Sequence, residues 1–263
     1  MPGLARMTAG AMRLPNGLQV MQLNPGETSL QYRNIFVNRE YGKHGIRLEP
    51  SSVIFDIGAN IGIASLYFHA ECPDARIFAF EPAAPLFEAL RANIAQCGSG
   101  ARAFCRAVGA SPGTAMLMIY PDTTAMSSIY ADPLEDQAVT RQFLANSGFA
   151  GADIEDMVVG RYDSIAQECE VTTVSMLLTE LRLDRLDLLK INVEKAESDV
   201  MAGITAEDWP KVCQLVMQVH DIDGRLTKVR TDLSKRGYDV FVRQDPLLRG
   251  TDIYDLAARR DRG

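Results

Sequence analysis

SVIFDIGANIGIASLYF, residues 52–68, is the stretch that decides the fold. Its first residues form a short apolar run, which predicts a buried strand that ends at Asp56. Two glycines follow, Gly58 and Gly62, with Asn60 between them. The residues after Gly62 have the spacing of a helix with one apolar face. A strand, a glycine turn and a helix in this order predict a small-ligand site at the carboxyl end of a parallel sheet.

The same alternation of strand and helix continues along the chain. It predicts an α/β fold, with a mostly parallel, doubly wound sheet that carries helices on both faces. The expected strands are 53–57, 76–80, 102–108, 186–192, 212–219, 238–243 and 253–258. The expected helices are 61–70, 85–97, 174–181, 197–202 and 222–235.

Two segments stand outside this alternation. Residues 1–50 are irregular and precede the first core strand, so we expect an N-terminal extension that acts as a lid, or one that only packs. Residues 51–263 form the main domain, with an insertion at about 111–170 that we expect to lie beside the site. Within these segments the patterns predict helices at 32–41 and 136–146, a strand at 113–120 and another strand within 153–165.

Composition limits the classes of function. The net charge of the 263-residue chain is −7, which argues against a nucleic-acid-binding protein. The five cysteines include no CxxC pair, and this usage is typical of reduced thiols in the cytoplasm. Neither a membrane span nor a signal-peptide pattern is present in the sequence, so we expect a cytoplasmic protein with no membrane partner.

The glycine turn excludes two common nucleotide sites. The chain has no match to the P-loop pattern, and the dinucleotide fingerprint would need glycines where Asn60 and Ile63 stand. The turn instead suits a ligand that has a nucleoside and a charged amino-acid end but no phosphate. Glu81 ends the second expected strand, 19 residues after Gly62. A carboxylate at this place can accept hydrogen bonds from both ribose hydroxyls.

Three motifs together carry a family resemblance: VIFDIGANIG, FAFEP and LDLLKINVEKAESDVMAG. With these motifs the chain resembles the FkbM-type family of S-adenosylmethionine-dependent methyltransferases over about residues 32–254. The resemblance implies a Rossmann-like, class I methyltransferase sheet of seven strands, the last of them antiparallel. Similar members are mostly O-methyltransferases, and many act on microbial secondary metabolites or sugars.

The resemblance implies S-adenosyl-L-methionine as the cofactor and assigns residues to each part of it. The methionine end would be lined by Asp56, Gly58, Asn60 and Gly62. Glu81 would hold the ribose. Ala107 and Val108 would border the adenine.

The fourth-strand motif departs from the family pattern K-I-D-V-E-G at two positions. Asn192 replaces the aspartate, and it can still orient a hydroxyl or the amine of the cofactor, so we place it in both the catalytic and the cofactor-binding sets. Lys195 replaces the glycine. It would either bring a positive charge to the substrate mouth or point to solvent.

A hydroxyl acceptor needs a group that removes its proton. His220 ends the fifth strand beside Asp221, and strand ends hold the functional groups in this architecture, so both are catalytic candidates. His220 is the candidate base, with a structural role as the alternative. The substrate candidates are Tyr41, His44, Glu194 and Lys195.

A metal site is a further alternative. Its ligands would be Asp187, Glu194, His220 and Asp221. These residues have no tight ligand spacing, so we expect no metal.

The sequence therefore predicts an O-methyltransferase that acts on a hydroxyl of a small molecule. The acceptor would be a secondary metabolite such as a polyketide, a peptide or a sugar-bearing compound, either free or tethered to a carrier protein. Two alternatives stay open, N-methylation of a similar metabolite and a non-catalytic module that binds S-adenosylmethionine.

Overall fold

The fold centres on a seven-stranded sheet in a computed structural model that describes residues 7–260. The strand order is β11-β12-β10-β9-β3-β4-β5. β12 runs antiparallel to its neighbours β11 and β10. All other adjacent pairs in the sheet are parallel. This confirms the expected class of sheet. The strands are β3 (Val53–Ile57), β4 (Arg76–Phe80), β5 (Ala101–Phe104), β9 (Leu188–Ile191), β10 (Gln214–His220), β11 (Asp239–Arg243) and β12 (Ile253–Arg259).

Helices cover both faces of the sheet because successive strand residues point to opposite sides and both sides are apolar. On β3, Ile54 packs with the first helices of the core, and its neighbours Val53 and Phe55 pack with the later ones. The first face is covered by α2 (Ile63–Glu71) and α3 (Ala84–Ile94). The second face is covered by α6 (Val174–Glu180), α7 (Glu197–Ala202) and α8 (Arg225–Lys235).

The N-terminal segment lies along the first face and is fastened to α3. The side chain of Asn93 accepts a hydrogen bond from the backbone N–H of Met21 (2.6 Å) and donates one to its carbonyl (2.8 Å). The segment comprises β1 (Gly10–Arg13), β2 (Gln19–Gln22), α1 (Pro25–Tyr32), a π-helical turn (Arg33–Val37) and a 3₁₀ turn (Glu40–Gly42). The parts of the expected extension at residues 1–6 lie outside the described residues.

The prediction of a helix at 32–41 was wrong about where it begins. The helix begins at Pro25, because the side chain of Asn24 accepts hydrogen bonds from the N–H groups of Gly26 and Glu27. Asparagine as N-cap and proline in the first turn are typical of a helix start. The sequence Asn24-Pro25-Gly26 therefore begins a helix here and does not form an isolated turn.

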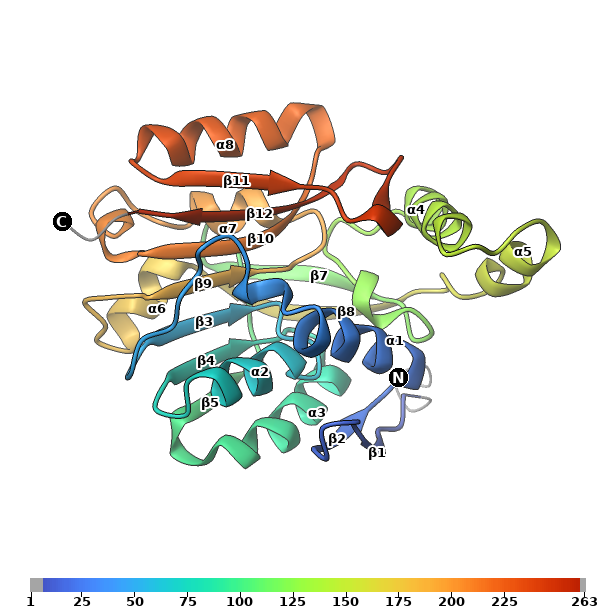
Figure 1. The fold of residues 1–263 in the computed structure, drawn as a ribbon, viewed down its shortest axis with the longest axis horizontal. Coiled ribbons are helices and arrows are strands. Elements are labelled where there is room, and N and C mark those ends of the chain that lie inside the picture. Colours follow the sequence, from blue (N-terminus) through green and yellow to red (C-terminus); the bar gives the residue numbers. More distant parts are fainter. Residues whose placement is uncertain (1–6, 261–263) are drawn as a thin grey trace.

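Residues 111–170 form most of a second, three-stranded sheet of order β6-β8-β7, together with two helices. The expected strand at 102–108 is divided at Cys105 and Arg106, and its second half joins this sheet. Figure 1 shows α4 and α5 beyond the carboxyl ends of the parallel core strands. The elements are β6 (Ala107–Val108), β7 (Gly113–Ile119), η5 (Thr124–Met126), α4 (Pro133–Asn146), α5 (Ala152–Val158) and β8 (Ile165–Thr172).

The expectation of a strand in the first part of 153–165 was wrong. This part is the helix α5, on which Ile154 and Val158 are one turn apart and are buried with Tyr120 and Tyr162. A spacing of four residues places both side chains on one helical face. The strand β8 begins only at Ile165.

Three short 3₁₀ turns join the remaining core elements, and a fourth, η8 (Pro246–Leu248), precedes β12. Figure 1 places η8 near α4. The three are Ala95–Gly100, Trp209–Lys211 and Ile222–Gly224. Among residues 7–260, no helix has the length and apolar character needed to cross a membrane. Residues 261–263 of the main domain lie outside the described part of the chain.

Candidate active site

A pocket opens at the carboxyl ends of β3, β4 and β9, and we call it the strand-end pocket. It gathers residues that are far apart in the sequence but follow neighbouring parallel strands, as expected for this architecture. Seven sequence-predicted site residues line it: Gly58, Asn60, Glu81, Ala107, Val108, Asn192 and Glu194.

Gly58 allows two strand ends to approach closely at the base of this pocket. Its φ is +72°, and a Cβ at this position would lie 1.7 Å from the carbonyl oxygen of Asn192. The backbone N–H of Asn192 in turn donates to the carbonyl of Ile57 at 3.0 Å. Any side chain at Gly58 would therefore force β3 and β9 apart.

Glu81 follows the neighbouring strand β4, lines the same pocket and is buried. Its two carboxylate oxygens accept hydrogen bonds from the backbone N–H groups of Asn60 (2.9 Å) and Ala83 (3.0 Å). Burial outweighs these hydrogen bonds and raises the pKa of Glu81 to about 7. A ligand that donates hydroxyl groups to this carboxylate would favour its charged form.

Asp56 and Gly62 do not line the strand-end pocket, which corrects the expectation for both. Asp56 is completely buried, and its carboxylate pairs with Lys190 Nζ (2.9 Å) and accepts from Ser65 Oγ (2.6 Å). Gly62 has a φ of +90° at the start of α2, where a Cβ would meet Leu90 on α3 at 2.8 Å. Both residues therefore support the turn from beneath.

Lys190 supports the turn of the strand-end pocket and was not among the predicted site residues. Its Nζ donates to the carbonyl of Gly58 at 2.7 Å and its side chain is 3% exposed. A buried lysine is costly unless it is paired. The signal was therefore a lysine inside the apolar strand LLKI, across from an aspartate at the end of a neighbouring strand.

His220 is held between two carboxylates. Its Nδ1 lies 2.9 Å from Glu197 Oε1, and its Nε2 lies 3.3 Å from Glu194 Oε2. Burial lowers the pKa of His220, but the hydrogen bonds and charges of Glu194 and Glu197 outweigh it and raise the pKa to about 10. The ring therefore carries a proton at neutral pH, which disfavours the expected role of His220 as the base.

Glu197 is the second residue that the sequence analysis missed, although it lies in the quoted fourth-strand motif. Its carboxylate is fully buried and pairs with His220 and with Arg225 Nη1 at 3.1 Å. Burial raises the pKa of Glu197, but the hydrogen bond and charge of His220 outweigh it and lower the pKa.

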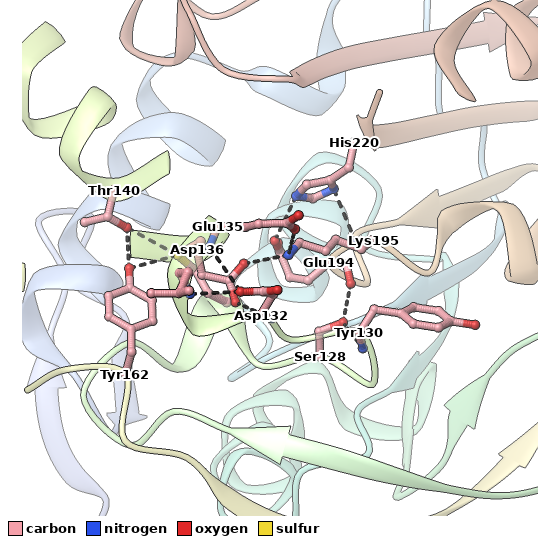
Figure 2. Close-up of polar contacts among 12 residues, drawn as sticks. Ser128, Tyr130, Asp132, Glu135, Asp136, Thr140, Tyr162, Glu194, Lys195 and His220 are labelled. Atoms are coloured by element: carbon pink, nitrogen blue, oxygen red, sulfur yellow. Dashed lines mark hydrogen bonds and ion pairs between the residues drawn. The ribbon is translucent and has the colours of Figure 1, made fainter. Parts of the chain in front are cut away.

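Lys195 neither reaches the substrate mouth nor points to solvent, in contrast to both expectations. It is buried, and its Nζ pairs with Glu135 (3.0 Å) and Asp136 (2.9 Å) at the start of α4. Burial lowers the pKa of Lys195, but the hydrogen bonds to the two carboxylates outweigh it and raise the pKa. Figure 2 shows this contact beside Glu194 and His220.

Asp221 does not join the pocket either. Its Oδ1 accepts a hydrogen bond from the backbone N–H of Leu226 (2.9 Å) in the first turn of α8, so the structure gives it a helix-stabilising role. Tyr41 and His44 line a separate small cleft that shares Asn192 with the strand-end pocket. His44 stacks on Phe241, with ring centroids 5.7 Å apart.

A larger cavity of about 630 Å³ lies between α1, η5, α4 and η8, and we call it the cap cavity. Its apolar lining comes from Leu30, Met126, Val139, Phe143, Leu144, Phe149, Met157, Leu247, Leu248 and Ile253. Among residues 7–260, the charged side chains that line it are six acids and one base: Glu27, Glu40, Asp122, Glu194, Asp245, Asp255 and Arg161. Glu194 thus lies on the wall that this cavity shares with the strand-end pocket.

The four residues of the alternative metal site do not form one group, although Glu194 and His220 are in contact. Asp187 lies at the opposite end of the sheet, where its carboxylate accepts from the backbone N–H of Val53 and pairs with Arg185. Within residues 7–260, no group of three or more histidine, cysteine, aspartate or glutamate side chains is placed to hold a metal ion.

The sheet order and the pocket at the β3 turn define a class I methyltransferase. The chain belongs to the FkbM methyltransferase family, since the model of the family described as "Methyltransferase FkbM domain" matches residues 56–240. This confirms the resemblance noted in the sequence. The family and the fold imply use of S-adenosylmethionine.

Full-length similarity supports the same assignment. The chain is 40% identical over 254 residues to the 31-O-demethyl-FK506 methyltransferase FkbM of Streptomyces tacrolimicus, covering 96% of this chain and 97% of that protein. It is also 37% identical to AMB antimetabolite synthetase AmbE of Pseudomonas aeruginosa. That match includes 94% of this chain but only 12% of the much longer synthetase. A solved methyltransferase FkbM from Methylobacillus flagellatus shares the fold, with a TM-score of 0.53, 12% identity, and 83% of this chain covering 46% of that one.

The residues of the strand-end pocket fit this cofactor. The side-chain oxygen of Asn192 is buried and has no hydrogen-bond partner among the described residues, so it can accept from a bound amine. Gly58 lines the pocket, and its lack of a side chain lets the Asn192 carbonyl approach and form the base of the pocket. Glu81 lines the pocket with a buried carboxylate that would accept hydrogen bonds from ribose hydroxyls. Among the described residues that line the pocket, Arg106 is the only one with a positively charged side chain. The lining therefore lacks the cluster of arginines or lysines that would suit a pyrophosphate.

Proposed function

We propose that this protein is an S-adenosylmethionine-dependent O-methyltransferase that acts on a hydroxyl group of a bulky, mostly apolar secondary metabolite. The observation that carries the proposal is the position of Glu194. Glu194 lines both the strand-end pocket and the cap cavity, and its carboxylate lies 3.3 Å from His220 Nε2. A group that must act on an acceptor beside a bound cofactor belongs at such a shared wall.

The cofactor, when bound, supplies an electrophilic methyl group. In this chain Glu81 would hold the ribose hydroxyls, Asn192 Oδ1 would accept from the amine, and Ala107 and Val108 would border the adenine. Alignment of the two reactants can lower the barrier by about 7–11 kcal/mol. The buried pair of Asp56 and Lys190 keeps the turn rigid, because Lys190 also donates to the carbonyl of Gly58.

Glu194 replaces His220 as the proposed base. An acceptor hydroxyl in the cap cavity would donate to a carboxylate oxygen of Glu194, which takes the proton as the oxygen–carbon bond forms. A general base of this kind typically contributes about 10²–10⁴-fold. His220, which is protonated at neutral pH, orients Glu194 through the 3.3 Å contact of Nε2.

The cap cavity supports a bulky apolar acceptor. Its volume of about 630 Å³ and its lining of aliphatic and aromatic side chains suit a small molecule of considerable size. The name of the Streptomyces tacrolimicus relative refers to methylation of 31-O-demethyl-FK506. The acceptor is either free or tethered to a carrier protein. Comparing the rates of methyl transfer to a free form and a carrier-bound form of one acceptor would distinguish the two.

N-methylation is the second candidate, and one observation favours it. Six of the seven charged residues that line the cap cavity are acidic, and such a wall attracts an amine. A transfer assay on matched alcohol and amine acceptors would separate the two.

The test of the proposal uses S-adenosylmethionine with a deuterated methyl group. The protein is incubated with 31-O-demethyl-FK506 and with a panel of hydroxylated metabolites, and the products are analysed by mass spectrometry. We expect one acceptor to gain a single labelled methyl group on oxygen. Binding of S-adenosylhomocysteine without transfer to any acceptor would favour the non-catalytic module instead.

A further inference from the structure

Lys195 has a backbone conformation that lysine rarely adopts. Its φ is +73°, and the preceding Glu194 has a φ of +47°. Residues in this left-handed region favour glycine, and others remain there only when their surroundings hold them. A lysine kept at such a position calls for an explanation in its side chain.

The side chain ends in a buried ion pair with the first turn of α4. Its exposed fraction is 9%, and that of Asp136 is 4%, with 2.9 Å between Lys195 Nζ and Asp136 Oδ1. Glu135 is also paired with Nζ but is 66% exposed, so solvent screens its contribution. The contact to Asp136 is therefore the one that connects the two segments most strongly.

Asp136 is itself fixed on its other side. Its Oδ2 accepts from the hydroxyl of Tyr120 (2.9 Å) and from the backbone N–H of Asp132 (3.1 Å). Because Asp132 is the N-cap of α4, the start of this helix is a rigid anchor. Figure 2 shows the anchor on one side of Lys195 and His220 on the other.

The backbone on the other side of the contact carries Glu194. The N–H of Lys195 donates to Glu197 Oε1 (2.9 Å), and its carbonyl accepts from Arg225 Nη1 (2.5 Å). The carbonyl of Glu194 accepts from the hydroxyl of Ser128. These contacts fix the loop that carries Glu194, the residue that lines both the strand-end pocket and the cap cavity.

We propose that Lys195 is a positioning residue that ties α4, a wall of the cap cavity, to the loop that carries Glu194. The tie holds the wall of the acceptor cavity in place beside the strand-end pocket, so it governs acceptor binding and leaves cofactor binding largely unaffected. This inference rests on the proposed function, since it takes the cap cavity as the acceptor site.

The decisive variant is Lys195→Gly. Glycine adopts the left-handed backbone freely, so this change removes the ammonium without adding strain. Lys195→Arg retains the cation and should restore the tie. Arg141→Gln is the matched control, because it removes an exposed ion pair between α4 and α5 (Arg141–Glu155, 2.9 Å) that does not involve the Glu194 loop.

Two measurements follow each variant. Hydrogen–deuterium exchange compares residues 133–146 with the core strand at 53–57. Titration with Nile red, a neutral apolar dye, reports the cap cavity while saturating S-adenosylhomocysteine occupies the cofactor site. Phe143→Arg, a change in the cavity wall, shows that the dye binds there.

We expect Lys195→Gly to exchange about tenfold faster at the start of α4 and to bind the dye about tenfold more weakly. The core strand and the affinity for S-adenosylhomocysteine should stay unchanged, and Lys195→Arg should restore both readouts. Unchanged exchange in α4, or equally faster exchange throughout the chain, would overturn the proposal. Failure of the wild type to bind S-adenosylhomocysteine would instead contradict the proposed function, and the exchange data would still decide the role of Lys195.

Discussion

The carbonyl oxygen of Asn192 lies 1.7 Å from the place where a Cβ on Gly58 would stand. This approach joins the carboxyl ends of β3 and β9, and it forms the base of the strand-end pocket. Gly58→Ala should therefore abolish binding of S-adenosylhomocysteine, measured by calorimetry, because the backbone of one strand must move. We expect a loss in affinity of at least about 100-fold.

The matched control for this change is Gly160→Ala. Gly160 also has a positive φ, +78°, but a Cβ there would meet no atom within 4 Å. This variant tests backbone strain alone and should cost about 1–2 kcal/mol of unfolding free energy. If both variants bind S-adenosylhomocysteine equally well, the close approach at Gly58 is not what shapes the pocket.

Glu81 should make cofactor affinity depend on pH. Its pKa is raised to about 7 by burial, and ribose hydroxyls donate to the ionised carboxylate. The affinity for S-adenosylhomocysteine should therefore rise by about tenfold from pH 6 to pH 8. Glu81→Gln should bind more weakly at pH 8 and lose this dependence, whereas a dependence that persists in the variant would belong to another group.

His220 should stabilise the fold below its folded pKa. That pKa is about 10 and the ordinary value is 6.5, so its contribution is complete below about pH 6.5 and is lost as pH rises through 10. His220→Gln removes one of the two cations that pair with the buried Glu197 and leaves Arg225 as the other, so it should lower the unfolding free energy at pH 7 by about 1–3 kcal/mol. Urea denaturation at pH 7 and pH 10 measures this, and the difference between variant and wild type should shrink at the higher pH.

The raised pKa of His220 also has a consequence for the pH dependence of catalysis. Since His220 stays protonated between pH 6 and pH 8, its titration should not appear in the pH–rate profile of methyl transfer. A rise in rate over that range that disappears in His220→Gln but persists in Glu81→Gln would restore His220 as the base.

Glu194→Gln separates the chemical step from cofactor binding. The amide keeps the size of the side chain but accepts no proton, so the rate of transfer should fall by about 10²–10⁴-fold. The affinity for S-adenosylhomocysteine should change by less than about threefold. An unchanged rate would remove Glu194 from the mechanism.

The core of the fold could be predicted from sequence because its strands are apolar on both faces. Runs such as 53–57 and 186–192 have no other stable place than a central parallel sheet. The helix α5 was missed because seven residues with two buried apolar positions give little periodic signal. The helix α1 was misplaced because Asn24-Pro25-Gly26 suits both a turn and a helix start.

The cofactor side of the site was predictable for a similar reason. Gly58, Asn60 and Glu81 follow strands directly, so the position of each strand end also placed the residue. The acceptor side of the site could not be predicted, because the positions and charges of its side chains depend on contacts between segments far apart in the chain. The protonation of His220 depends on Glu197, 23 residues earlier, and Lys195 meets Glu135, 60 residues earlier.

A crystal structure with S-adenosylhomocysteine would locate the cofactor and the reacting methyl position together. We expect the ribose on the Glu81 carboxylate, the adenine beside Ala107 and Val108, and the sulfur facing the wall that the strand-end pocket shares with the cap cavity at Glu194. Density for the ligand in the cap cavity, or a ribose that makes no contact with Glu81, would contradict this expectation.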